Sequence, residues 1–157
     1  MRTLLICFLF CSVQLLAQPH LQIPATNFRL PTAKGDSVQL SSYRGKVVLL
    51  DFWASWCGPC RVANKQLVKM YPSLHQKGVV FLSVSLDDNE QSWRTAVKKD
   101  QLQWTQLIDL RAWNSPVANA YDVLTIPATF LIDQEGNVVA RNLSGDVLEK
   151  SIKSLLH

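Results

Sequence analysis

Two cysteines, Cys57 and Cys60, are separated by two residues in the stretch DFWASWCGPC, residues 51–60. A run of apolar residues (47–50) precedes this stretch, and a pattern with helical spacing follows it. Cysteines at this spacing can form a reversible dithiol and disulfide when they lie in the first turn of a helix. There the unpaired backbone N–H groups and the positive end of the helix dipole favour the thiolate of the first cysteine. The stretch therefore predicts thiol–disulfide redox chemistry.

A buried strand and a helix must hold this pair in place. Residues 47–53 are predominantly apolar, which predicts a central strand covered on both faces. After the cysteines, apolar residues recur at helical spacing: Ala63, Leu67, Met70, Tyr71 and Leu74. We expect Pro72 to kink or shorten this helix and Gly78 to end it.

Strands and helices alternate along the rest of the chain. A hairpin is predicted for residues 28–40 around the turn 34–36, and further strands at 79–85, 105–108, 128–132 and 138–140. The last two strands are joined by a predicted turn at 133–137. Residues 87–89 offer an N-cap for a helix bearing Trp93, and further helices are predicted near 115–121 and at the C-terminus. This order indicates an α/β fold with a mixed central β-sheet flanked by helices.

Length and composition indicate one ordinary globular domain. The chain has 157 residues, of which 48% are hydrophobic and 18% charged, and it is long enough to bury a real core. The formal net charge of +4 is spread along the sequence, and no basic run is longer than Lys98-Lys99. We therefore expect no nucleic-acid partner.

The N-terminus has the pattern of a secretory signal peptide. Arg2 supplies a positive charge, and the apolar segment that runs to about Leu16 is shorter than a membrane-spanning helix requires. We assign residues 1–18 to the signal peptide, with cleavage near Ala17-Gln18, and residues 19–157 to the mature domain. This assignment predicts a periplasmic or otherwise extracytoplasmic protein. Retention of the segment as a membrane anchor and lipidation of Cys11 are the open alternatives.

Removal of the signal peptide leaves two cysteines in the chain. Cys7 and Cys11 lie in the predicted signal, so the mature protein keeps only Cys57 and Cys60. A disulfide between them closes a very short loop and adds little stability, so reactivity explains the pair better than structure does. Half of a zinc site is the alternative, but no second CxxC motif or spaced pair of histidines completes one. We expect no metal, and no cofactor other than the redox-active disulfide.

The stretch of residues 51–60 resembles the active site of thioredoxin, and the longer layout resembles the secreted thioredoxin-like proteins of the TlpA/ResA type. Two further segments carry the likeness: VSLD (84–87), which is followed by an inserted helix, and IPATFLID (126–133), which is similar to the family's cis-proline strand. The likeness covers about residues 24–156. It implies a thioredoxin-like fold with an N-terminal hairpin and an inserted helix.

The resemblance implies catalytic roles for three residues. Cys57 would be the exposed nucleophile, and Cys60 would attack the resulting mixed disulfide and release the product. Asp51 would accept the proton of Cys60, directly or through a water, with a pKa raised by desolvation. A solvated carboxylate at the end of the strand is the alternative for Asp51. Some ResA-type proteins carry a glutamate where this chain has Ala63, so Asp51 would act alone.

Five further residues are expected to bind the substrate. Trp56 is predicted to form an apolar rim beside the nucleophile, Gly58 to permit close approach of the partner, and Pro59 to fit the first turn of the helix. The resemblance implies a cis bond before Pro127. Such a bond would turn the backbone of Ile126 towards the nucleophile, where it can pair with an extended substrate strand.

These features predict a thiol–disulfide oxidoreductase that reduces protein disulfides outside the cytoplasm. The Gly-Pro dipeptide between the cysteines is that of thioredoxin, which is strongly reducing at about −270 mV. A reductant in such a compartment needs a membrane electron supplier, and the resemblance implies a donor of the DsbD/CcdA type. We expect protein disulfides as substrates and a monomeric state.

Two other functions compete with this prediction. A thiol-dependent peroxidase of the peroxiredoxin type shares the fold, but it requires a proline and a threonine seven and three residues before its reactive cysteine. This chain has Leu50 and Ala54 at those positions. A non-catalytic thioredoxin-like binding module would not need both cysteines. The cysteine pair therefore favours the oxidoreductase.

Overall fold

A six-stranded mixed sheet forms the centre of the computed structural model, which describes residues 22–156. Its strand order is β1-β8-β7-β4-β5-β6, with bounds Ile23–Pro24 (β1), Val48–Trp53 (β4), Val80–Ser85 (β5), Thr105–Ile108 (β6), Ala128–Ile132 (β7) and Asn137–Arg141 (β8). Strands β4, β5 and β6 are parallel, whereas β7 runs antiparallel to β4 and β8. The fold is thioredoxin-like, as the sequence predicted.

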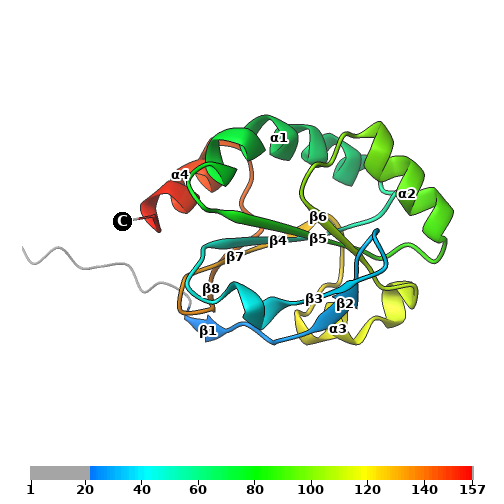
Figure 1. Ribbon diagram of the computed structural model, residues 1–157, viewed down its shortest axis with the longest axis horizontal. Helices are drawn as coiled ribbons and strands as arrows, with labels where there is room; N and C mark the ends of the chain where they lie inside the picture. Colours follow the sequence, from blue (N-terminus) through cyan, green and yellow to red (C-terminus); the bar gives the residue numbers. More distant parts are fainter. Residues whose placement is uncertain (1–21, 157) are drawn as a thin grey trace, which may run out of the picture.

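Helices cover one face of this sheet, and the hairpin with shorter helices covers the other (Figure 1). On the first face lie α1 (Gly58–His75), α2 (Glu90–Lys99) and α4 (Gly145–Ser154). On the second lie the hairpin of β2 (Arg29–Pro31) and β3 (Ser37–Gln39), the 3-10 helix η1 (Leu40–Tyr43) and α3 (Pro116–Ala120). A second 3-10 helix, η2 (Ala112–Asn114), precedes α3. The predicted hairpin is present, but it forms a separate two-stranded sheet.

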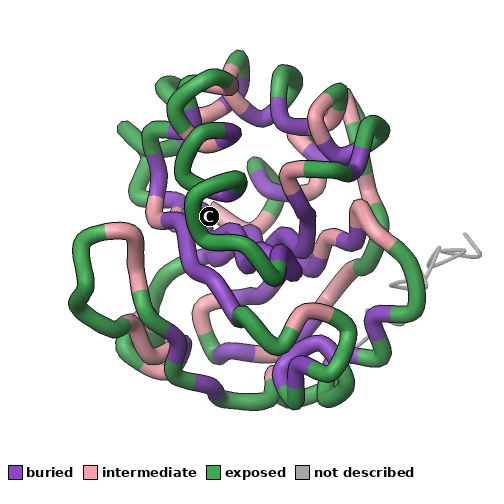
Figure 2. Tube along the Cα trace, turned by 90° about the vertical axis from the view of Figure 1, so that its right-hand side faces the viewer, coloured by how far each residue is buried: buried purple, intermediate pink, exposed green. Residues whose placement is uncertain are grey.

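The core divides into two apolar clusters, one on each side of the sheet. Figure 2 shows the buried segments gathered at the centre of the molecule and the exposed segments around its outside. All six residues of β4 are buried, which confirms the prediction of a strand covered on both faces. Trp53, at the end of β4, is 0% exposed and packs in the cluster beneath α1 and α2. The strand that leads to the cysteines is therefore anchored before the redox stretch begins.

Two local features differ from what the sequence predicted. Helix α1 continues through Pro72 to His75, although a proline removes one helical hydrogen bond. The missing bond is the one from residue 72 to the carbonyl oxygen of Val68. Leu74 beyond it is fully buried, so packing retains the last turn. Strand β1 was not predicted. It pairs Ile23 with Val138 at the sheet edge, and a two-residue strand is too short to show a periodic pattern.

The predicted signal peptide, residues 1–18, lies outside the described residues. Among residues 22–156, no helix has the length and apolar character needed to cross a membrane.

Candidate active site

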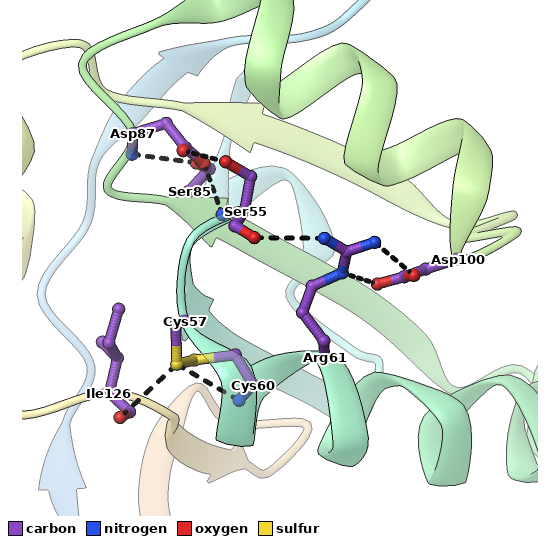
Figure 3. The surroundings of a disulfide bond; sticks show 8 residues. All are labelled: Ser55, Cys57, Cys60, Arg61, Ser85, Asp87, Asp100 and Ile126. Carbon is purple, nitrogen blue, oxygen red and sulfur yellow. Dashed lines mark hydrogen bonds and ion pairs between the residues drawn. A yellow bond between two sulfur atoms is a disulfide. The ribbon is translucent and has the colours of Figure 1, made fainter.

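The two cysteines form a disulfide at the N-terminus of α1 (Figure 3). Cys57 is the N-cap residue, and the backbone N–H of Cys60 donates to its Sγ at 3.1 Å. In the reduced protein the same N–H and the helix dipole would favour a thiolate on Cys57. Cys60 is 0% exposed and Cys57 only 6%, so the expectation of an exposed nucleophile was wrong for this disulfide form. The bond to buried Cys60 and the neighbouring loops hold Sγ of Cys57 just beneath the protein surface.

Exposed residues surround Cys57 on its solvent side. Trp56 is 56% exposed, and Gly58 and Pro59 are also exposed. Pro59 lies in the first turn of α1, where its missing N–H would have no helical partner anyway. A Cβ added to Gly58 would meet no atom within 4 Å, so glycine leaves open space here. A partner can therefore approach Cys57 beside the exposed ring of Trp56.

The loop before β7 completes this surface. The Ile126–Pro127 peptide bond is cis, as the resemblance implied. The carbonyl oxygen of Ile126 lies 3.7 Å from Sγ of Cys57 (Figure 3). Ile126 and Pro127 are both half-buried. A main-chain carbonyl beside the reactive sulfur is a suitable acceptor for the backbone N–H of an extended peptide.

Asp51 lies within β4 rather than at its end, and only 2% of it is exposed. This burial contradicts the alternative of a solvated carboxylate. Burial raises the pKa of Asp51 from 3.8 to about 7, against the opposing effect of a hydrogen bond from Ser83. Oδ2 of Asp51 accepts from Oγ of Ser83 at 3.2 Å, and Nε1 of Trp104 donates to the same Oγ at 2.8 Å. A carboxyl group that titrates near neutrality can exchange protons at physiological pH.

A cavity of about 210 Å³ gives Asp51 a route towards solvent. Its lining comes from the middle of α1, the cis-proline loop with β7, and the segment that leads into α4: Ala63, Gln66, Leu67, Met70, Pro127, Thr129, Asn142, Leu143, Ser144, Gly145 and Leu148. The cavity therefore lies on the same side of β4 as the helix that carries Cys60.

Residues 21–141 match the sequence profile of the AhpC/TSA family, which is more than half of the chain. The chain belongs to the AhpC/TSA family. Within this family it is a thioredoxin-superfamily protein of the TlpA/ResA type, as the following relatives indicate.

Three relatives link this AhpC/TSA family chain to one activity. It is 33% identical over 134 residues to the thiol-disulfide oxidoreductase ResA of Geobacillus kaustophilus, a match that covers 83% of this chain and 75% of that protein. The thioredoxin domain of a Bacteroides vulgatus thiol-disulfide oxidoreductase superposes with a TM-score of 0.80 at 30% identity, covering 90% of this chain and 100% of that one. A thiol-disulfide oxidoreductase from Bacteroides fragilis gives a TM-score of 0.79 at 36% identity, covering 84% and 98%. This AhpC/TSA family member is a thiol–disulfide oxidoreductase.

The residues of a peroxide site are replaced by apolar side chains in this family member. Leu50 and Ala54, at the positions where a peroxiredoxin has its proline and threonine, are both 0% exposed. Neither side chain carries a hydroxyl that could bind a peroxide. The local chemistry thus agrees with disulfide exchange rather than peroxide reduction.

Sequence reasoning missed a network that fixes the loop immediately before Cys57. The backbone N–H of Ser55 donates to Oδ2 of Asp87 at 2.9 Å, and its hydroxyl donates to Oδ1 at 2.5 Å. The hydroxyl of Ser85 donates to Oδ2 of Asp87 at 2.5 Å. Asp87 is 1% exposed, so these bonds satisfy a buried carboxylate. Figure 3 shows the carboxylate facing the loop from the end of β5.

Arg61 holds the same loop from the other side. Its Nη1 donates to the carbonyl oxygen of Ser55 at 3.1 Å, and its guanidinium pairs at two points with Asp100, where Nη2 lies 2.6 Å from Oδ1. Asp100 is the C-cap residue of α2. The sequence interpretation treated residues 87–89 as an N-cap, and Asn89 does cap α2 by accepting from the N–H of Ser92. An acidic residue directly after a buried strand was the signal that could have identified Asp87.

Proposed function

We propose that this thiol–disulfide oxidoreductase reduces protein disulfides outside the cytoplasm. The observation that carries the proposal is the arrangement of the cystine at the N-terminus of α1, with Cys57 near the surface and Cys60 fully buried behind it. The attacking sulfur is thus accessible through a small movement, while the resolving sulfur is reached only from within the protein.

The reaction begins from the dithiol. The thiolate of Cys57 attacks one sulfur of a substrate disulfide, and the other substrate sulfur leaves as a thiolate that takes a proton from water. Cys60 then passes its proton to Asp51, and its thiolate attacks Sγ of Cys57. The mixed disulfide breaks, the second substrate thiolate is released, and the Cys57–Cys60 disulfide forms. Two electrons have passed from the enzyme to the substrate.

The buried carboxyl group supports the assignment of Asp51 as proton acceptor. Its pKa of about 7 allows it to be ionised before the transfer and protonated after it, near neutral pH. The cavity beside it provides a route by which the proton reaches solvent after each cycle. These properties are unusual for a carboxylate and match a group that moves a proton in every turnover.

Substrate recognition would use the surface around Cys57. A cysteine-containing segment in extended conformation would donate a backbone N–H to the Ile126 carbonyl, which lies 3.7 Å from the reactive sulfur. Pro127 fixes this loop, Trp56 supplies an apolar contact, and Gly58 and Pro59 leave room for the substrate backbone.

The direction of electron flow, the compartment and the donor belong to this proposal. The Gly-Pro dipeptide supports a reductant, because thioredoxin has the same dipeptide and a potential of about −270 mV, against about −120 mV for the oxidant DsbA. The N-terminal signal pattern supports export of a mature domain that begins near residue 19. An exported reductant requires electrons from the membrane, so we assign it a donor of the DsbD/CcdA type. It would act as a monomer.

Trapping of mixed disulfides tests the proposal. Cys60→Ser should accumulate substrate proteins linked to Cys57, and these should be released by dithiothreitol on a non-reducing gel. Cys57→Ser is the matched control and should trap none. Identical behaviour of the two variants would contradict the mechanism. A measured reduction potential near that of DsbA would refute the direction while leaving the exchange chemistry intact.

A further inference from the structure

Polar residues form a row across the centre of the sheet, on the face covered by α1. Strand register places Asp51 of β4 opposite Thr129 of β7 on one side and opposite Ser83 of β5 on the other. Ser83 in turn lies opposite Gln106 of β6. Side chains two residues apart on a strand share a face, and Trp53 and Phe81, two residues from Asp51 and Ser83, pack in the cluster beneath α1. Such a row is unusual in a buried apolar sheet, because an unpaired polar group is costly there, and the amide of Gln106 has no hydrogen-bond partner.

The hydrogen bonds of Ser83 have a fixed direction. The indole Nε1–H of Trp104 can only donate, and it lies 2.8 Å from Oγ of Ser83. That oxygen therefore accepts from Trp104, and its single proton is free to point to Oδ2 of Asp51, 3.2 Å away. Ser83 is 0% exposed and Trp104 only 6%, so water does not compete freely for these groups. The pair delivers one donated hydrogen bond to the Asp51 carboxyl.

We propose that Ser83, oriented by Trp104, is a positioning residue that holds Asp51 as a carboxylate ready to take the proton of Cys60. The inference rests on the proposed role of Asp51 in the resolving step. A donated hydrogen bond stabilises the ionised form of a carboxyl group, whereas burial stabilises the neutral form. Ser83 therefore sets how much of Asp51 is ready to act as a base at neutral pH.

Burial raises the pKa of Asp51 and the hydrogen bond from Ser83 lowers it, and no charged group among the described residues adds to these two effects. The residues that face Asp51 from α1, from the cis-proline loop and β7, and from the start of α4 are uncharged. Gln106 on β6 is also uncharged. The other titratable groups of the reaction are the thiols of Cys57 and Cys60, and neither is present while the two sulfurs are joined in the disulfide.

A titration of the oxidised protein tests the inference without turnover. Carbon-13 NMR of the aspartate carboxyl groups should show one midpoint near pH 7, which Asp51→Asn removes. Ser83→Ala should raise that midpoint by about one pH unit, a tenfold change in proton affinity. Trp104→Phe should raise it less, because the hydroxyl remains but loses the donor that orients it. Ser85→Ala is the matched control, since this buried serine on the same strand donates to Asp87 and should leave the midpoint unchanged.

The resolving step supplies the second measurement. Rapid-mixing experiments can measure the rate at which substrate thiol is released from the mixed disulfide on Cys57. At pH 7 this rate should be about fivefold lower in Ser83→Ala than in the wild-type protein. A midpoint near 8 leaves about a tenth of the carboxyl ionised, instead of about half. The rate should approach that of the wild-type protein above pH 9, where Asp51 is ionised in both. A structural role for Ser83 would lower the rate at every pH.

Two results would overturn the inference. One is an unchanged or lower Asp51 midpoint in Ser83→Ala, with thermal melting to verify that the variant is folded. Trp104→Phe keeps an aromatic ring to pack against Tyr71 and Phe81, so it provides the same comparison if Ser83→Ala is unstable. The other is a raised midpoint with an unchanged resolving rate, which would remove Asp51 from that step. Neither result would affect the trapping of substrates by Cys60→Ser, so the proposed function is tested separately.

Discussion

Replacement of Asp51 by asparagine should stabilise the oxidised protein above pH 7. The carboxyl group of Asp51 is 2% exposed, and its pKa is raised from 3.8 to about 7, chiefly by burial. Below pH 3.8 it is protonated in both the folded and the unfolded chain. Between pH 3.8 and 7 only the folded chain keeps the proton, so each rise in pH favours unfolding. Above pH 7 the carboxyl is ionised in both states, and the full cost of burying the charge is present.

The magnitude follows from this interval. At about 1.4 kcal/mol for each pH unit, the rise from 3.8 to about 7 corresponds to about 4 kcal/mol. No discount for solvent screening applies, because the group is buried. Asparagine keeps an oxygen that can accept from Ser83, and its amide takes the place of the carboxyl group beside the cavity that Asp51 lines. The substitution therefore removes the charge and preserves most of the shape.

Urea denaturation at pH values from 4 to 9 measures this effect, without reductant so that the disulfide remains closed. The free energy of unfolding of Asp51→Asn minus that of the wild-type protein should be small near pH 4. It should grow in favour of the variant up to about pH 7 and then level off. Asp88→Asn, at an exposed position next to Asp87, controls for the general loss of one negative charge. A difference that does not depend on pH, or a variant less stable than wild type above pH 7, would refute the reasoning.

Three further substitutions probe the surroundings of the cystine. Trp56→Ala should raise KM for a protein disulfide such as insulin about tenfold but hardly change the reduction of a small aromatic disulfide, because the exposed ring can contact a large partner; equal effects on both substrates would argue against a docking role. Asp87→Ala should lower the free energy of unfolding in urea by about 3 kcal/mol, since Ser55 loses two acceptors for its hydrogen bonds. Asp100→Asn should cost about 1 kcal/mol in low salt and less in 1 M salt, because its ion pair with Arg61 is partly exposed; a cost independent of salt would contradict this.

Local patterns were sufficient to predict most elements of the fold. The continuous apolar character of β4 and β5, the helical spacing after Cys60 and the turn between β7 and β8 all depend on residues close together in the chain. Side chains repeat every two residues in a strand and every 3.6 in a helix, so these elements can be recognised from the sequence. Strand β1 could not be, because it exists only through its pairing with β8.

The sequence by itself determined the chemistry: two cysteines at the first turn of a helix, in a chain that has no other cysteine after residue 11. Only the tertiary structure decided how that chemistry is supported. Ser83 of β5 contacts Asp51, and Trp104, just before β6, contacts Ser83. Asp87 contacts Ser55 across 32 positions of sequence, and the Ile126 carbonyl lies beside Cys57 across 69. Burial, hydrogen-bond direction and proton affinity depend on such distant neighbours, and no local pattern encodes them. Strand register and packing set them, and these exist only once the chain has folded.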